Sequence, residues 1–156
     1  MKKSILFAGA LIIYTQIAGA INVTGNASVV IQPAITATQT QSMNFGTVTP
    51  TSSAGTVVLS PAGAVTSATL GLYDATTAGI FNITAADSTA LTINFSAGTV
   101  TSGANTMTVN TFTTTPTTYT TSAAGALTVD VGATLNVAAN QPSGSYTGTY
   151  TMTVSY

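Results

Sequence analysis

The sequence closes on Ser145-Tyr-Thr-Gly-Thr-Tyr-Thr-Met-Thr-Val-Ser-Tyr156, the stretch that decides the fold. Every odd-numbered residue in it is Ser or Thr, and every even-numbered residue is apolar or Gly. A period of two over this length predicts a β-strand with one face in a core and the other in water. Thr, Tyr and Val also favour the pleated, half-buried surface of a sheet. We therefore expect one face of this strand to pack in the core of an all-β domain through Tyr146, Tyr150, Met152, Val154 and Tyr156.

A second alternating stretch runs from Ile21 to Ile31, far from the first in the sequence. Its polar face carries Asn22, Thr24, Asn26 and Ser28, and Val30 breaks the pattern. Its other face carries Ile21, Val23, Gly25, Ala27, Val29 and Ile31. Alternation alone favours a simple interpretation, in which this segment is the first strand of the chain's own sheet.

Shorter strand signals fill the sequence between these two stretches, with Gly, Asp, Ser and Pro between them. No segment beyond the N-terminal apolar run shows a helical period, and about eight to ten short strands fit an immunoglobulin-like, antiparallel two-layer β-sandwich. The threonine tract Thr111–Thr121 is typical of an extended edge or a surface loop, and Gly132-Ala133 of a bulge or tight turn. The signals are Thr56–Leu59, Thr69–Tyr73, Ile80–Ala85, Leu91–Phe95, Thr106–Asn110, Leu127–Val131 and Leu135–Val137.

The first 20 residues have the pattern of a secretory signal peptide. Lys2 and Lys3 precede an apolar run, and Ala18-Gly19-Ala20 resembles a cleavage site. The apolar run is shorter than the roughly 20 residues that span a bilayer, which favours a signal peptide over a retained membrane helix. We expect cleavage after Ala20, a single mature domain of residues 21–156, and no membrane span in it.

Cleavage there leaves a chain without Lys, Arg, His or Cys. Such a chain cannot neutralise a phosphate backbone, which excludes nucleic acid as a partner. It also has no imidazole base, no thiolate nucleophile and none of the usual zinc ligands. The sequence therefore predicts a protein that is not an enzyme and that holds no metal and no cofactor.

The remaining charged residues are Asp74, Asp87 and Asp130, which lie in unrelated segments. Calcium requires several carboxylates in one loop, and no such run is present. We interpret Asp74 and Asp87 as turn residues and Asp130 as a guard of a strand edge. The tyrosines suggest a sugar-binding platform as an alternative to core packing, and Tyr119 in the threonine tract is the one we would test for ligand contact.

Three motifs resemble the DUF4402 family of secreted bacterial proteins: Met43-Asn-Phe-Gly-Thr-Val48, Gly132-Ala-Thr-Leu-Asn-Val137 and the run from Gly144 to Tyr156. That family is in turn similar to spore coat protein U and to the archaic chaperone–usher pilins. The likeness covers nearly all of the mature chain. Those proteins usually contain a disulfide, which this chain lacks because it has no cysteine.

The resemblance implies a sandwich that is completed by a neighbour. In chaperone–usher pilins the C-terminal strand borders an open groove, which the N-terminal extension of the next subunit fills. Applied to this chain, residues 21–32 become a candidate donor strand, with Ile21, Val23, Gly25, Ala27, Val29 and Ile31 entering the groove. The acceptor strand would carry Tyr146, Tyr150, Met152, Val154 and Tyr156. Pairing within the chain and donation to a neighbour both remain open.

The function predicted in this way is that of a structural or adhesive subunit of a pilus- or coat-like assembly. Its partners would be other copies of the chain or related subunits, with a periplasmic chaperone and an outer-membrane usher. Its location would be the bacterial cell surface or a fimbrium, reached through the periplasm. The alternative is a self-complete, monomeric secreted β-sandwich that binds carbohydrate or a host protein.

Overall fold

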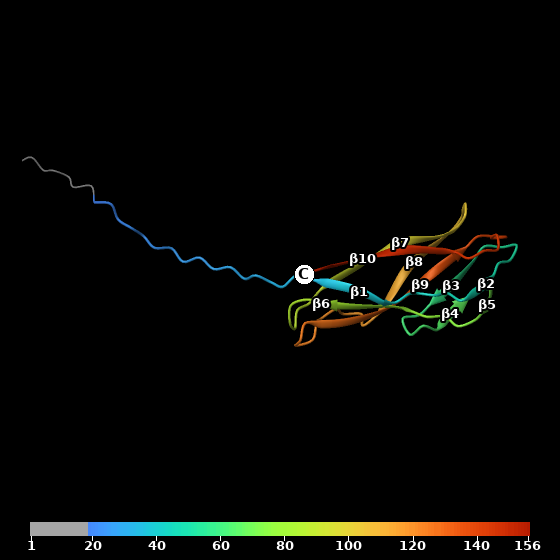
Figure 1. Ribbon diagram of the computed structural model, residues 1–156, viewed down its shortest axis with the longest axis horizontal. Coiled ribbons are helices and arrows are strands. Elements are labelled where there is room, and N and C mark those ends of the chain that lie inside the picture. Colours follow the sequence, from blue (N-terminus) through green and yellow to red (C-terminus); the bar gives the residue numbers. More distant parts are fainter. Residues whose placement is uncertain (1–18) are drawn as a thin grey trace, which may run out of the picture. The chain divides into compact units, whose positions relative to one another are not determined.

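The structure, a computed structural model, describes residues 19–156. The predicted signal peptide therefore lies outside the described residues, except for Gly19 and Ala20. The chain divides into two units, Met1–Ile31 and Gln32–Tyr156. We call Gln32–Tyr156 the β-body and the described part of the first unit, residues 19–31, the N-terminal segment (Figure 1).

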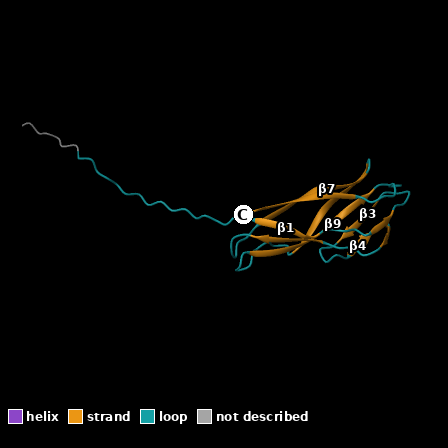
Figure 2. Cartoon of the chain, in the orientation of Figure 1, coloured by secondary structure: helices purple, strands orange, loops and turns teal. Residues whose placement is uncertain are grey.

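The β-body is built from ten strands joined by turns and loops (Figure 2). All of its strand pairs are antiparallel, which confirms the predicted all-β, immunoglobulin-like sandwich. The strands are β1 (Thr36–Gln41), β2 (Thr47–Thr49), β3 (Gly55–Leu59), β4 (Val65–Ala68), β5 (Gly71–Tyr73), β6 (Gly79–Thr84), β7 (Thr92–Ser102), β8 (Asn105–Thr115), β9 (Ala126–Val137) and β10 (Thr147–Ser155).

The main sheet follows the order β1-β6-β9-β8-β7-β10, so that β1 and β10 are its two edges. The long strand β9 lies in the middle and pairs with β8 along one side. Along its other side it pairs first with β6 and then with β3, which carries β4. A separate ribbon is formed by β2 and β5. Strand β9 thus carries residues of both halves of the hydrophobic core.

The core has two clusters of buried side chains. The first gathers Val57, Leu70, Val109, Ala133, Leu135 and Val137. The second gathers Ile83, Ala85, Leu91, Ile93, Val129 and Val131. Inward-facing residues alternate along β9, as the period of two in the sequence predicts.

Some local predictions are confirmed and others are wrong. The β8–β9 pairing is irregular at the predicted bulge, where Ala133 lies opposite two residues of β8, although β9 makes no turn there. The first part of the threonine tract belongs to β8, and Thr113–Thr115 pair only with β9 among the described strands, as expected for an extended edge. Asp130 does not guard an edge, because it pairs with Ile80 on one side and Thr115 on the other. Asp74 and Asp87 do lie in exposed turns, as predicted.

The N-terminal segment forms no strand, and the first strand within residues 19–156 begins only at Thr36. The interpretation of Ile21–Ile31 as the first strand of its own sheet is therefore not what the structure shows. Alternation marks a segment that can form a strand, but a strand also needs a partner that supplies hydrogen bonds.

Gly132 marks the point where β9 passes closest to the end of β3. A Cβ atom at this position would lie 2.2 Å from the Leu59 carbonyl oxygen and 2.6 Å from the Ser60 carbonyl carbon. Both are backbone atoms, so relief requires the strands to separate.

We expect Gly132→Ala to lower the free energy of unfolding by about 1–3 kcal/mol, the usual cost of overpacking. Gly71→Ala in β5 is the matched control, because the nearest atom to its new Cβ would be 3.4 Å away. Urea unfolding of the two variants measures the difference. Equal stabilities would show that the β3–β9 contact is looser than the structure has it.

Candidate functional site

Strand β10 pairs with β7 along one edge and, among residues 19–156, with no other strand. Its inner face carries Tyr150, Met152 and Val154, and each of these side chains is only half-buried. Tyr146 precedes the strand and is also half-buried, while Tyr156 follows it and is 46% exposed. The structure thus places the five predicted acceptor residues along the inner side of one uncovered edge. The expectation that all five are packed in a core is met only in part.

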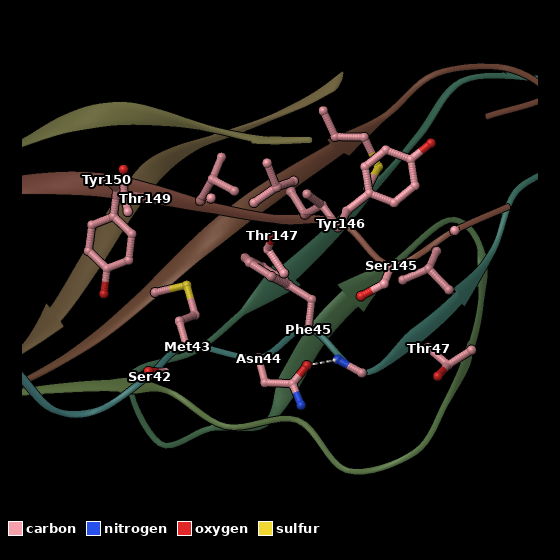
Figure 3. A pocket seen from close by; sticks show the side chains of 18 residues that line it. Ser42, Met43, Asn44, Phe45, Thr47, Ser145, Tyr146, Thr147, Thr149 and Tyr150 are labelled. Atoms are coloured by element: carbon pink, nitrogen blue, oxygen red, sulfur yellow. Dashed lines mark hydrogen bonds between the residues drawn. The ribbon is translucent and has the colours of Figure 1, made fainter. Parts of the chain in front are cut away.

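An open groove lies beside the first half of β10, with a cavity volume of about 700 Å³. One wall is the segment Ser42–Val48, which follows β1 and includes the start of β2, and the other is Gly144–Tyr150 (Figure 3). The floor consists of Val100, Met107, Val109 and Leu135. We call this cavity the β10 groove. It exposes one side of the first core cluster, because its floor and the Met43, Phe45 and Val48 wall residues all belong to or pack against that cluster.

Tyr150 reaches across the interior beside the groove. Its ring lies 5.1 Å from the ring of Phe112 and 6.1 Å from that of Phe81, between ring centroids. Figure 3 shows the ring pointing from β10 toward the opposite wall at Ser42 and Met43. A Cβ atom on Gly79 of β6 would lie 2.5 Å from the Tyr150 hydroxyl. The absence of a side chain at Gly79 therefore makes room for this hydroxyl.

The Tyr150 hydroxyl oxygen is buried and has no hydrogen-bond partner in the described part of the chain. Its burial raises the pKa of the phenol above the ordinary 10.0, because the charged form loses its hydration. A buried polar group without a partner costs free energy. The hydrogen-bonding capacity of the Tyr150 hydroxyl is therefore unused in the isolated β-body.

Tyr156 closes the other end of the β10 edge. Its hydroxyl donates a hydrogen bond to the Pro33 carbonyl oxygen at 2.5 Å and accepts one from the Ala86 N–H at 3.1 Å. These bonds tie the end of β10 to the chain just before β1 and to the loop after β6. The edge of β10 is therefore open at Gly144–Tyr150, where the groove lies, and tied at Tyr156.

The predicted donor residues lie in the N-terminal segment, outside any strand. Every residue from Gly19 to Ala34 is exposed, and the exposed fraction of the large apolar side chains there is 81–87%. The structure therefore gathers the acceptor residues at one edge and leaves Ile21, Val23, Gly25, Ala27, Val29 and Ile31 in solvent.

A family profile described as "Domain of unknown function (DUF4402)" matches residues 35–156, which include the whole of β1–β10. The chain belongs to the DUF4402 family. No curated protein and no solved structure gave a significant match. The match begins just after the N-terminal segment, so the DUF4402 domain coincides with the β-body.

The other predicted candidates lie apart from the β10 groove of this DUF4402 domain. Tyr119 lines a second cavity of about 380 Å³ with Phe95 and Phe112, and its hydroxyl is 2.7 Å from that of Thr114. Among residues 19–156 no three His, Cys, Asp or Glu side chains come together as metal ligands. Within the same range no helix has the length and apolar character needed to cross a membrane.

Sequence reasoning missed one side of the groove. The pattern marked Met43 and Phe45 as apolar, but nothing in it places the segment Ser42–Val48 opposite Gly144–Tyr150. Val100 and Met107 could have been found, because a hairpin at Gly103 pairs them directly and both face inward.

The two edge tyrosines should respond oppositely to loss of the hydroxyl. We expect Tyr150→Phe to raise the free energy of unfolding by up to about 1–3 kcal/mol, because it removes a buried group without a partner. Tyr156→Phe should lower it by about 1–2 kcal/mol, since two hydrogen bonds are lost. Urea unfolding of both variants measures the contrast, and a destabilised Tyr150→Phe would reveal a hidden partner for that hydroxyl.

Stability should also fall at high pH through Tyr150. Its pKa is raised in the folded chain, so its contribution is complete below the unfolded pKa of 10.0 and is lost as pH rises through the higher folded pKa. The described residues contain no Lys or Arg, so no basic side chain loses its charge in this pH range. Unfolding followed from pH 8 to 12, roughly one unit either side of the ordinary range of phenols, should show a smaller decline in Tyr150→Phe. Parallel curves would contradict the assignment.

Proposed function

We propose that this DUF4402 protein is a structural or adhesive subunit of the bacterial surface that assembles by strand donation. In the proposed mechanism, the N-terminal segment of one copy lies along β10 of the next and fills the β10 groove. The proposal extends to its setting: secretion through the periplasm, delivery by a chaperone and an outer-membrane usher, and a role without catalysis. The resemblance to pilins suggests this mechanism, and the following features of the chain support it.

The observation that carries the proposal is that one chain contains both an exposed apolar segment with the pattern of a strand and a core with one uncovered side. Seven large apolar side chains are exposed among the described residues, and five of them lie between Ile21 and Ile31. Burying one Val or Ile side chain contributes about 1.5–3 kcal/mol. A groove with an apolar floor and a free strand edge offers such burial together with backbone hydrogen bonds.

The direction of the strands favours exchange between copies. Strands β1 and β10 run in opposite directions through the sheet order, and Tyr156 bonds Pro33 at the end where β10 finishes. Only Gln32 separates Ile31 from Pro33. A segment folding back on its own β10 from this point can therefore run only parallel to it.

Antiparallel pairing would require Ile31 to lie at the start of β10. Nine residues of strand separate the two ends of β10, a span of roughly 30 Å, which the single residue Gln32 cannot bridge. Antiparallel pairing is also somewhat more stable per residue than parallel pairing. The geometry thus favours a donor from a second copy.

Both edges of the sheet lack the usual protection against such pairing. Exposed edge strands in soluble proteins commonly carry Lys, Pro or an inward charge. Neither β1 nor β10 contains a charged residue or a proline. No repulsion therefore opposes an approaching strand.

Charges placed on the two faces of the N-terminal segment should act differently. Val23→Asp and Val29→Asp put a carboxylate on the face that enters the groove, and we expect loss of detergent-resistant ladders on unboiled gels. Thr24→Asp and Ser28→Asp are the matched controls on the polar face and should keep the ladders. All four residues are exposed in the isolated chain, so the melting temperature of the monomer should not change.

The alternative function predicts a different result. A self-complete monomer that binds carbohydrate or a host protein would form no ladders in the unaltered mature chain, or ladders insensitive to all four substitutions. Either outcome would contradict assembly by strand donation.

A further inference from the structure

We infer that Tyr150 fixes the register of the donated strand, because Gly25 is the one apolar-face residue of the donor that fits opposite its ring. This inference rests on the proposed function and names the contact that sets its geometry. It concerns a specificity-determining pair, with one residue on the acceptor strand and one on the donor.

The interior beside Tyr150 is already filled. The Tyr150 ring has three aromatic neighbours, with centroid distances of 5.1 Å to Phe112, 6.1 Å to Phe81 and 6.4 Å to Phe95. Its hydroxyl reaches Gly79 on β6, at the opposite side of the interior. A donor side chain at this level has no room unless the ring moves, which would break these contacts.

Past Tyr150, toward the start of β10, the space opens. The β10 groove there is about 700 Å³ in volume, and Gly148, the next apolar-face residue of the alternation, lines it without a side chain. Branched apolar side chains fit at this end. The β10 edge is therefore packed at Tyr150 itself and open between Tyr150 and the start of the strand.

The donor segment has one position that suits the packed part of the edge at Tyr150. Of its six apolar-face residues, only Gly25 lacks a side chain. With Gly25 opposite Tyr150 in antiparallel pairing, Ala27 faces Gly148 and Val29 faces Tyr146, at the wide end. On the other side, Val23 faces Met152 and Ile21 faces Val154; both β10 residues are only half-buried and lie outside the groove, so these two donor side chains cover them instead of entering the cavity.

The alternation along β10 supports this count. The irregularity in the β7–β10 pairing lies between Thr149 and Thr151 on β10, where one residue of β10 is opposite two of β7. The extra residue belongs to β7, so the free edge of β10 stays regular. Shifting the donor by two residues would place Val23 or Ala27 against the Tyr150 ring instead.

Gel ladders of the full mature chain test the register. We expect Gly25→Val to abolish the ladders seen with the unaltered chain, whereas the control Ala27→Val should retain them because it faces Gly148. Combining Gly25→Val with Tyr150→Ala should restore the ladders, since the ring that blocks the new side chain is gone. Ladders that persist in Gly25→Val would overturn the register while leaving strand donation intact.

Engineered cysteines give a second measurement that does not depend on how well Tyr150→Ala folds. The chain has no cysteine of its own, so each introduced thiol is the only one present. A mixture of the single variants Val23→Cys and Met152→Cys should form an intermolecular disulfide dimer under mild oxidation. Ala27→Cys with Met152→Cys is the control and should not.

The possible results distinguish a wrong register from the absence of strand donation. Cross-linking through Ala27 instead of Val23 would overturn the proposed register and favour a parallel donor. No cross-link in either mixture, together with no ladders in the unaltered chain, would overturn strand donation and the register with it.

Discussion

The last strand of the sheet has a partner along one edge only, and the rest of the molecule is arranged around this constraint. Strand β10 pairs with β7, while its outer backbone groups face no other strand. Its inner side chains consequently remain half-buried, in contrast to Val129 and Val131 on the central strand β9, which are fully buried. An alternating apolar sequence is therefore present twice in the chain. One copy is in β10, which has a neighbouring strand on one side only, and the other is in the N-terminal segment, which belongs to no sheet.

Two tyrosines stabilise the incomplete edge of the β-body in different ways. Tyr156 ties the end of β10 to Pro33 and Ala86 through its hydroxyl, so the edge does not fray from that end. Tyr150 fills the interior through its ring, but leaves its hydroxyl without a partner. The β-body thus keeps a packed second cluster next to an open first cluster. This asymmetry explains why the cavity lies beside the start of β10 and not along its whole length.

The period of two in the sequence predicted the fold class and the inner face of β10, because periodicity reports which side of a strand is apolar. It did not predict which strand lies on that side. Gly132-Ala133 was interpreted as a bulge or tight turn; the β8–β9 pairing is irregular there, but β9 does not turn, and the glycine lets the Leu59 backbone approach. The wall at Ser42–Val48 depends on contacts between residues about a hundred positions apart, which no local pattern encodes. The segment Ile21–Ile31 had the pattern of a strand, but pattern alone supplies no hydrogen-bonding neighbour.

Charge is the usual means by which strands select a partner and a register, and this chain has almost none to use. Complementary charges steer association and penalise wrong alignments. The described residues carry three carboxylates and no basic group, and none of the three lies on β10 or in the N-terminal segment. Uncharged strands of alternating Thr and Val can slip by two residues with little change in hydrogen bonding. Selection of one register must then come from size, and the largest difference in size available is between the Tyr150 ring and the bare backbone of Gly25.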